Sequence, residues 1–162
     1  MSSVQLIAQT VADVRAMVES MDAETRKQLS PEWLARVYSD GDVDPWTLGF
    51  AIALSDGENG EDRIGTCGFK APPDAEGVVE IAYGIAPEHQ GKGFATEAAA
   101  AMVDLAFGDS HVRTVRAHTI SASGASARVL TKCGFQMIGQ VDDPEDGRVW
   151  RWEKRKTERM PA

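Results

Sequence analysis

The sequence predicts an α/β (α+β) protein in which one mixed sheet carries helices on both faces. Two observations lead to this fold class. The middle of the chain alternates strand, helix and strand, whereas hairpin patterns occur on either side of it. The chain has 162 residues, of which 43% are hydrophobic and 26% charged, so we expect one domain spanning residues 1–162.

The N-terminal part predicts a short strand and two capped helices. We expect the strand at residues 5–8. Apolar residues then follow at helical spacing behind Thr10, an N-cap type, and Asp13 can complete the first-turn cap. Ser30 followed by Pro31 marks the second helix, because proline at the first helical position needs no amide partner.

The next segment predicts a hairpin. Large apolar residues alternate with small or polar ones from Trp46 to Leu54, which indicates a half-buried strand. A loop of glycine and acidic residues at 56–62 joins it to a returning strand at 64–69. A proline-containing loop at 72–77 leads into the centre of the chain.

The central stretch consists of a strand at 78–85, a polar loop at 86–93 and an alanine-rich helix at 94–107. The first amides of a helix lack intrahelical partners and lie at the positive end of its dipole. Gly91 and Gly93 let the backbone turn sharply and bring amides close to an anion. The stretch therefore predicts a site for a phosphate-bearing ligand, with an ordinary strand-to-helix turn as the alternative.

Two common phosphate motifs do not fit this loop. A P-loop requires Ser or Thr after its Gly-Lys pair, whereas Gly93 follows Lys92 here. The dinucleotide fingerprint requires glycine or alanine at its sixth position, which is occupied by Thr96.

The C-terminal part predicts a strand at 112–120 and a short helix at 126–133 that ends at Gly134. Two further strands are expected, and a loose basic tail at 155–162 follows them. These strands cover residues 135–141 and 148–154.

Two stretches of the chain resemble motifs of the GNAT N-acetyltransferase superfamily. The first is Gln90-x-x-Gly93-x-Ala95, which follows a strand ending in IAP at 85–87. The second, SARVLTKCGF at 126–135, resembles a later helix of the family that ends in Lys-x-Gly-Phe. The resemblance covers most of the chain and looks most like the branch of the ribosomal-protein alanine N-acetyltransferases.

The resemblance implies a mostly antiparallel central sheet that splays into a V between the strands at 78–85 and 112–120. It also implies acetyl-CoA as co-substrate, held in that V, and no metal. The backbone of one strand residue would pair with the pantetheine arm, loop amides would hold the pyrophosphate, and a serine stands where the family often has asparagine. The donor-binding residues implied in this way are Ile85, Gln90, Gly91, Lys92, Gly93, Phe94, Ala95, Thr96 and Ser123.

The expected reaction is transfer of the acetyl group to a primary amine, on a protein N-terminus or a small molecule, by direct attack in a ternary complex. Glu80 is the candidate base, because it faces away from the apolar set of its strand, beside the small Ala82 and Gly84. A surface carboxylate paired across the sheet is the alternative. His118 is the second candidate because its ordinary pKa suits proton transfer, and a structural histidine is its alternative.

Leu130 is a departure from the family pattern. It occupies the position at which many members carry a tyrosine that protonates the departing thiolate. Another group must then do this work, or the thiolate leaves unassisted. The second functional hypothesis is therefore a non-catalytic acyl-CoA-binding regulatory module.

Composition excludes some partners. A net charge of −8 argues against a general nucleic-acid binder, and no apolar run approaches the ~20 residues of a membrane span. Cys67 and Cys133 lack metal-ligand spacing, so we expect free buried thiols in a reducing, cytoplasmic compartment. The aromatic strand around 149–152 suggests either a homodimer interface or core packing.

Overall fold

The computed structural model describes residues 4–54, 62–144 and 147–156. It contains a seven-stranded sheet in the order β1-β2-β3-β4-β5-β7-β6. The strands are β1 (Val4–Ala8), β2 (Phe50–Leu54), β3 (Asp62–Phe69), β4 (Val78–Ile85), β5 (Thr114–Thr119), β6 (Gln136–Asp143) and β7 (Gly147–Arg155). The helices are α1 (Val11–Ser20), α2 (Ala23–Arg26), α3 (Pro31–Val37), α4 (Pro45–Leu48), α5 (Phe94–Phe107) and α6 (Ala125–Lys132).

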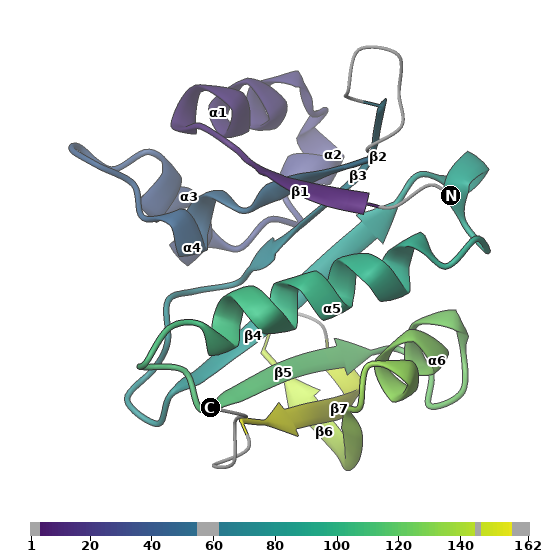
Figure 1. Ribbon diagram of the computed structural model, residues 1–162. Coiled ribbons are helices and arrows are strands. Elements are labelled where there is room, and N and C mark those ends of the chain that lie inside the picture. The colour runs from purple at the N-terminus through teal and green to yellow at the C-terminus, as the bar shows by residue number, and fades with distance from the viewer. Residues whose placement is uncertain (1–3, 55–61, 145–146, 157–162) are drawn as a thin grey trace.

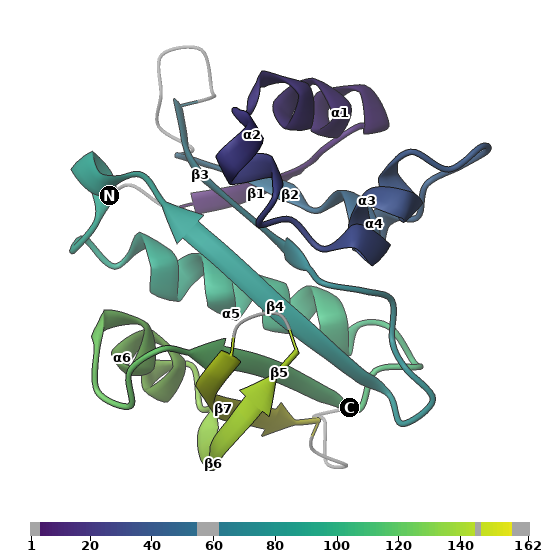
Figure 2. The same cartoon turned by 180° about the vertical axis from the view of Figure 1, so that it is seen from behind.

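Helices lie on both faces of the sheet, as the sequence predicted. α5 crosses the front of β4 in Figure 1, whereas α1 to α4 lie toward the viewer in the reverse view of Figure 2. All neighbouring strands are antiparallel except β4 and β5, which are parallel. The mixed, mostly antiparallel sheet is therefore confirmed.

The sheet opens between β4 and β5. These strands pair at three positions only, from Val78 opposite Thr114 to Glu80 opposite Arg116. Beyond Glu80 the two strands diverge, and Figure 2 shows β4 running away from β5 toward its C-terminal end. This is the V that the sequence resemblance implied, and it places the C-terminal half of β4 at an opening in the sheet.

The predicted caps of the first helices are confirmed. Thr10 Oγ1 accepts a hydrogen bond from the Asp13 amide at 3.0 Å, and the Asp13 carboxylate accepts one from the Thr10 amide at 3.0 Å. Ser30 Oγ accepts from the Trp33 amide at 3.2 Å, with Pro31 in the first turn of α3. α2 was not expected; the Asp22 side chain caps this single turn.

The prediction that a strand starts at Trp46 was wrong. Residues 45–48 form α4, because the Asp44 carboxylate accepts from the Thr47 amide at 2.9 Å and Pro45 stands at the helix start. Gly49, with φ of +70°, ends this turn, and β2 begins one residue later. Local capping therefore overrides an alternating apolar pattern here.

The C-terminal tail begins later than predicted. Arg155 is the last residue of β7, and the Lys156 amide donates to Arg113 O at 2.7 Å. Lys156 Nζ also donates to Asp109 O at 3.1 Å. Residues 157–162 and most of the predicted 56–62 loop lie outside the described residues.

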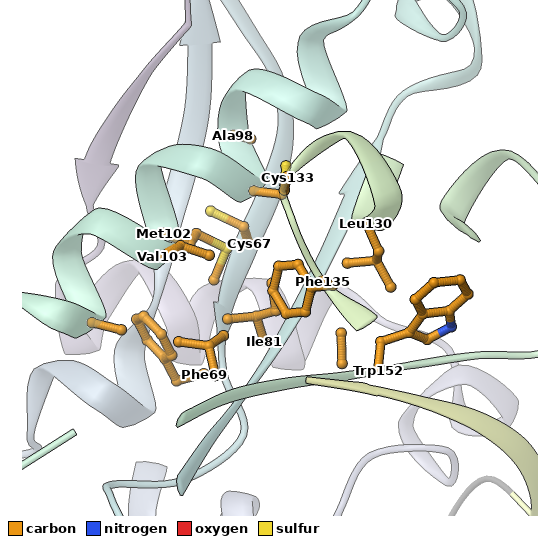
Figure 3. Close-up of a cluster of buried hydrophobic side chains, with 14 of the residues drawn as sticks. Cys67, Phe69, Ile81, Ala98, Met102, Val103, Leu130, Cys133, Phe135 and Trp152 are labelled. Carbon is orange, nitrogen blue, oxygen red and sulfur yellow. The ribbon is translucent and has the colours of Figure 1, made fainter. Parts of the chain in front are cut away.

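The core lies between α5 and the sheet and extends to α6 (Figure 3). α5 presents alanines to the sheet, which lets the helix approach closely, and fully buries Met102. Burying one such side chain contributes roughly 1.5–3 kcal/mol. Cys67 and Cys133 are free and buried, as expected.

Trp152 belongs to this core. It is 6% exposed, and its indole N–H donates to Thr119 Oγ1 at 3.0 Å. Trp152 is therefore part of the core and does not form an exposed surface. A homodimer stays a prediction. Among the described residues, no helix has the length and apolarity needed to span a membrane.

Candidate active site

The opening between β4 and β5 exposes backbone groups of β4. The Lys70 amide donates to Glu80 O at 2.9 Å, and the Ala86 amide donates to Ile64 O at 2.8 Å. Because hydrogen-bonding direction alternates along a strand, even-numbered residues of β4 face β3, and Tyr83 and Ile85 turn their backbone groups toward the opening. An extended ligand can therefore add to β4 at this edge.

A cavity of about 500 Å³ adjoins this edge and the N-terminus of α5. All the donor-binding residues expected from the sequence line it, except Lys92 and Ser123. Lys92 is exposed in the loop, and Ser123 lies exposed in a turn where its amide bonds Ser121 Oγ at 3.2 Å. Neither residue lies on the cavity wall, and their contact with the donor stays a prediction.

The loop geometry explains the need for its glycines and glutamine. Gly91 and Gly93 have φ of +76° and +87°, a left-handed conformation that other residues adopt at a cost. Gln90 Nε2 donates to Ile85 O at 2.8 Å, which ties the start of the loop to the end of β4. Gly93 caps α5 without any side-chain hydrogen bond, so the first amides of this helix remain directed at the cavity.

The charge of this cavity is positive, in contrast to the protein as a whole. Among the described residues, its charged lining side chains are Arg128 and Lys132, both exposed on α6, and no carboxylate lines it. These two residues were not predicted from the sequence. Their four-residue spacing places them on one face of a helix, and this pair of cations in an acidic chain could have indicated an anion-binding surface.

The two candidate proton-transfer residues form one hydrogen-bonded pair. His118 Nδ1 lies 2.9 Å from Glu80 Oε2, and His118 Nε2 accepts from Arg151 Nε at 3.1 Å. The second contact requires the neutral tautomer with the proton on Nδ1, so His118 donates to Glu80. Lys70 Nζ lies 3.1 Å from the same carboxylate oxygen.

The exposures of the pair distinguish their roles. Both residues line a cavity of about 170 Å³ in the opening, but the Glu80 side chain is 19% exposed and the His118 side chain 4%. Glu80 can meet a substrate directly. His118 is nearly buried and can orient the Glu80 carboxylate.

Three potential metal ligands, Glu80, His118 and Asp143, have donor atoms within 4.8 Å of one another. Lys70 and Arg151 already contact the first two of these groups, at 3.1 Å each. A metal ion would have to displace these cationic side chains, so we assign no metal to the cluster.

Tyr83 is a site residue that was not among the residues predicted from the sequence. It lines the 500 Å³ cavity, the small cavity beside Glu80 and a third cavity described below. Burial raises the pKa of its hydroxyl to about 12, and the neighbouring Ser126 side chain partly opposes this rise. Ser126 precedes the buried Leu130 by one turn on α6, so Tyr83 places a hydroxyl beside that face of the helix.

A third cavity, of about 420 Å³, lies on the side of α1, α3 and α4. Its walls come from these helices, from β3 and from residues 82–84 of β4. Tyr83 and Gly84 line both this cavity and the 500 Å³ cavity. Two ligands held in these cavities would therefore meet at one short segment of β4.

Comparison with known proteins identifies a family. The model described as the acetyltransferase (GNAT) domain matches residues 4–136. The uncharacterized N-acetyltransferase p20 of Bacillus licheniformis is 33% identical over 85 residues, which are 52% of this chain and 48% of that protein. The uncharacterized N-acetyltransferase YoaA of Bacillus subtilis strain 168 is 37% identical over 79 residues, or 49% and 45%. The chain spans about half the length of these curated relatives.

Solved structures share the fold over nearly the whole chain. The aminoglycoside acetyltransferase AAC(6')-Ib, in complex with ribostamycin and coenzyme A, has a TM-score of 0.64 and 21% identity, covering 99% of each chain. The spermidine N-acetyltransferase from Vibrio cholerae, in complex with coenzyme A and spermine, has a TM-score of 0.64 and 16% identity, covering 94% of this chain and 95% of the other. At these identities the likeness establishes the fold.

Proposed function

The chain belongs to the GNAT acetyltransferase family, and on this premise we propose that it transfers an acetyl group from acetyl-CoA to a primary amine. The observation that carries the proposal is that Tyr83 and Gly84 of β4 line two separate cavities. Two substrates can lie together there in a ternary complex. Such positioning alone can supply ~7–11 kcal/mol toward a bimolecular reaction.

Acetyl-CoA occupies the 500 Å³ cavity in this proposal. The amides at the start of α5 receive the pyrophosphate, and Arg128 and Lys132 add positive charge for the phosphates. The pantetheine arm extends along the open edge of β4, opposite Tyr83 and Ile85. The thioester then lies where the cavities meet.

Glu80 acts as the base. An amine attacks only as the neutral species, so a carboxylate in the opening must accept its proton, directly or through water. His118 and Lys70 hold the Glu80 carboxylate in place, at 2.9 and 3.1 Å from the same oxygen. His118 is a positioning residue in this scheme.

The reaction forms a carbon–nitrogen bond and breaks a carbon–sulfur bond. The amine nitrogen attacks the thioester carbonyl carbon, and a backbone N–H of β4 that faces the opening stabilises the charge that grows on the carbonyl oxygen. The thiolate of coenzyme A departs and receives a proton from the Tyr83 hydroxyl. The hydroxyl carries its proton at neutral pH, as a phenol with an ordinary pKa near 10 also does, and burial raises this pKa to about 12. The tyrosinate left by the transfer regains a proton from water. Tyr83 thereby supplies a proton donor in place of the tyrosine that many family members carry at the position of Leu130.

A non-catalytic acyl-CoA-binding module is less well supported. Such a module needs neither the carboxylate at the opening nor a second cavity, and this chain has both. The acceptor itself, whether a protein N-terminus as in the ribosomal-protein alanine branch or a small molecule, stays a prediction.

Calorimetric titration with acetyl-CoA tests the proposal, with NAD and ATP as control ligands. We expect saturable binding of acetyl-CoA and no comparable binding of either control. Absence of acetyl-CoA binding would reduce the loop to an ordinary strand-to-helix turn and would remove the basis of the proposal.

A further inference from the structure

We propose that the acceptor is a primary amine with one positive charge and an apolar body, and that polycations such as polyamines and aminoglycosides are poor acceptors. This inference rests on the proposed function and deepens it. It concerns the 420 Å³ cavity on the side of α1, α3 and α4, which we call the acceptor cavity.

The wall of the acceptor cavity is mainly apolar. Its large lining residues outside the core under α5 are Met17, Leu29, Trp33 and Leu48, with Tyr83 at the edge shared with the other cavities. The Trp33 indole N–H donates to Thr47 O at 2.9 Å, so this ring offers the cavity a flat apolar face and no free donor. A volume of about 420 Å³ suits a small ligand or one amino-terminal side chain.

The polar groups on this wall are neutral with one exception. Gln9, Gln28, Ser30, Thr47 and Thr66 carry no charge. The Cys67 side chain packs in the hydrophobic core, where burial raises the pKa of its thiol to about 12, so it adds no charge to this wall.

The exception is a cation. Lys70 is the one charged residue among the described residues that line the acceptor cavity, and its ammonium lies 3.1 Å from Glu80 Oε2. Behind the wall, Arg36 donates to Lys70 O at 2.6 Å and to Thr47 Oγ1 at 3.1 Å. The nearby Asp44 uses its carboxylate oxygens on the amide and hydroxyl of Thr47, at 2.9 Å each.

The charged groups around the acceptor cavity provide a carboxylate partner for one substrate ammonium only, among the described residues. Glu80 lines the neighbouring small cavity, which shares Ala82 and Tyr83 with the acceptor cavity, so a carboxylate is available at the reacting end. A second or third ammonium would lie against Met17 and Leu48, or near Lys70, without a carboxylate partner among the described lining residues. Removing an unpaired charge from water is costly, so polycations are disfavoured.

The test compares initial rates of coenzyme A release with matched acceptors. The panel is phenylethylamine, a peptide amide with N-terminal phenylalanine, spermidine and kanamycin. We expect kcat/KM at least about tenfold higher for the two apolar monoamines than for the two polycations, a difference of about 1.4 kcal/mol. The first two acceptors distinguish a small-molecule source from a peptide source, and preference for either supports the inference.

Equal or faster reaction with spermidine or kanamycin would overturn this inference while leaving the acetyltransferase proposal intact. Absence of release with all four amines, despite binding of acetyl-CoA, would overturn both.

A variant that adds a negative charge provides a second test of whether the charge of the acceptor cavity determines the preference for monoamines. Gln28→Glu places a carboxylate at the exposed rim of the acceptor cavity and should raise the ratio of kcat/KM for spermidine to kcat/KM for phenylethylamine several-fold. Gln136→Glu, on an exposed position of β6 outside the cavity, makes the same charge change and should leave this ratio unaltered. An unchanged ratio in Gln28→Glu would contradict the charge argument.

Discussion

The carboxylate of Glu80 and the imidazole of His118 are hydrogen-bonded at 2.9 Å, although 38 residues separate them in the chain. They lie on β4 and β5, whose pairing ends at Glu80 and Arg116, so His118 lies two residues past the last paired position. The contact places a carboxylate, held by a nearly buried histidine, in a small cavity that shares Tyr83 with both larger cavities.

Replacing Glu80 by glutamine removes the base but keeps the shape of the side chain. We expect kcat to fall by roughly 10²-fold or more, because general-base catalysis contributes about 10²–10⁴-fold. The Kd for acetyl-CoA should stay unchanged, since Glu80 does not line the donor cavity. Glu76→Gln, in the loop before β4, is the control and should behave as wild type; full activity in Glu80→Gln would place the base elsewhere.

His118 should act through its N–H donated to Glu80. Asparagine can present an N–H close to the position of Nδ1, whereas leucine cannot, so His118→Asn should keep several-fold more activity than His118→Leu. The pH dependence of kcat/KM should shift in His118→Leu and stay near that of wild type in His118→Asn. If both variants lose stability and activity equally, with unshifted pH profiles, the role of His118 is only structural.

Tyr83→Phe removes the hydroxyl and keeps the ring. We expect kcat to fall roughly 10- to 100-fold with acetyl-CoA affinity retained, as proton donation to a leaving group commonly contributes at least this much. Because the pKa of Tyr83 is raised to about 12, the hydroxyl stays protonated as pH rises to 10, so it contributes no loss of activity below that pH. Ser126→Ala should have a smaller effect; a Tyr83→Phe enzyme with wild-type kcat would show that the thiolate leaves without this donor.

Arg128 should contribute charge to donor binding. Arg128→Ala should weaken acetyl-CoA binding roughly two- to fivefold, about 0.4–1 kcal/mol for an exposed ion pair. The difference should shrink as salt rises, because exposed charges are screened. Calorimetry at low and high salt measures both effects. Arg148→Ala, which removes an exposed arginine outside the cavity, is the control, and equal affinities of Arg128→Ala and wild type at low salt would contradict the assignment.

The features that were predicted well from the sequence are those that depend on residues close together in the chain. The reciprocal cap of Thr10 and Asp13, and the turn through Gly91 and Gly93 into α5, follow from backbone chemistry within a few positions. The side of the sheet to which the Glu80 side chain points was predicted from the alternation of side chains along its strand.

What the sequence did not predict depends on contacts across the fold. α4 replaced an expected strand because the Asp44 cap outweighed the alternation that includes Trp46. The place of Tyr83 in the site was not predicted, because the role of its hydroxyl depends on the cavities that surround it. No local pattern shows that Glu80 and His118 form one pair, which depends on the register of β4 and β5.

The most direct test of the account is the rate of coenzyme A release from acetyl-CoA in the presence and absence of an apolar primary amine. The account predicts release that requires the amine, yields the acetylated amine in equal amount and is largely lost in Glu80→Gln. Amine-independent release, or none with protein that binds acetyl-CoA, would contradict the claim that two substrates react at β4.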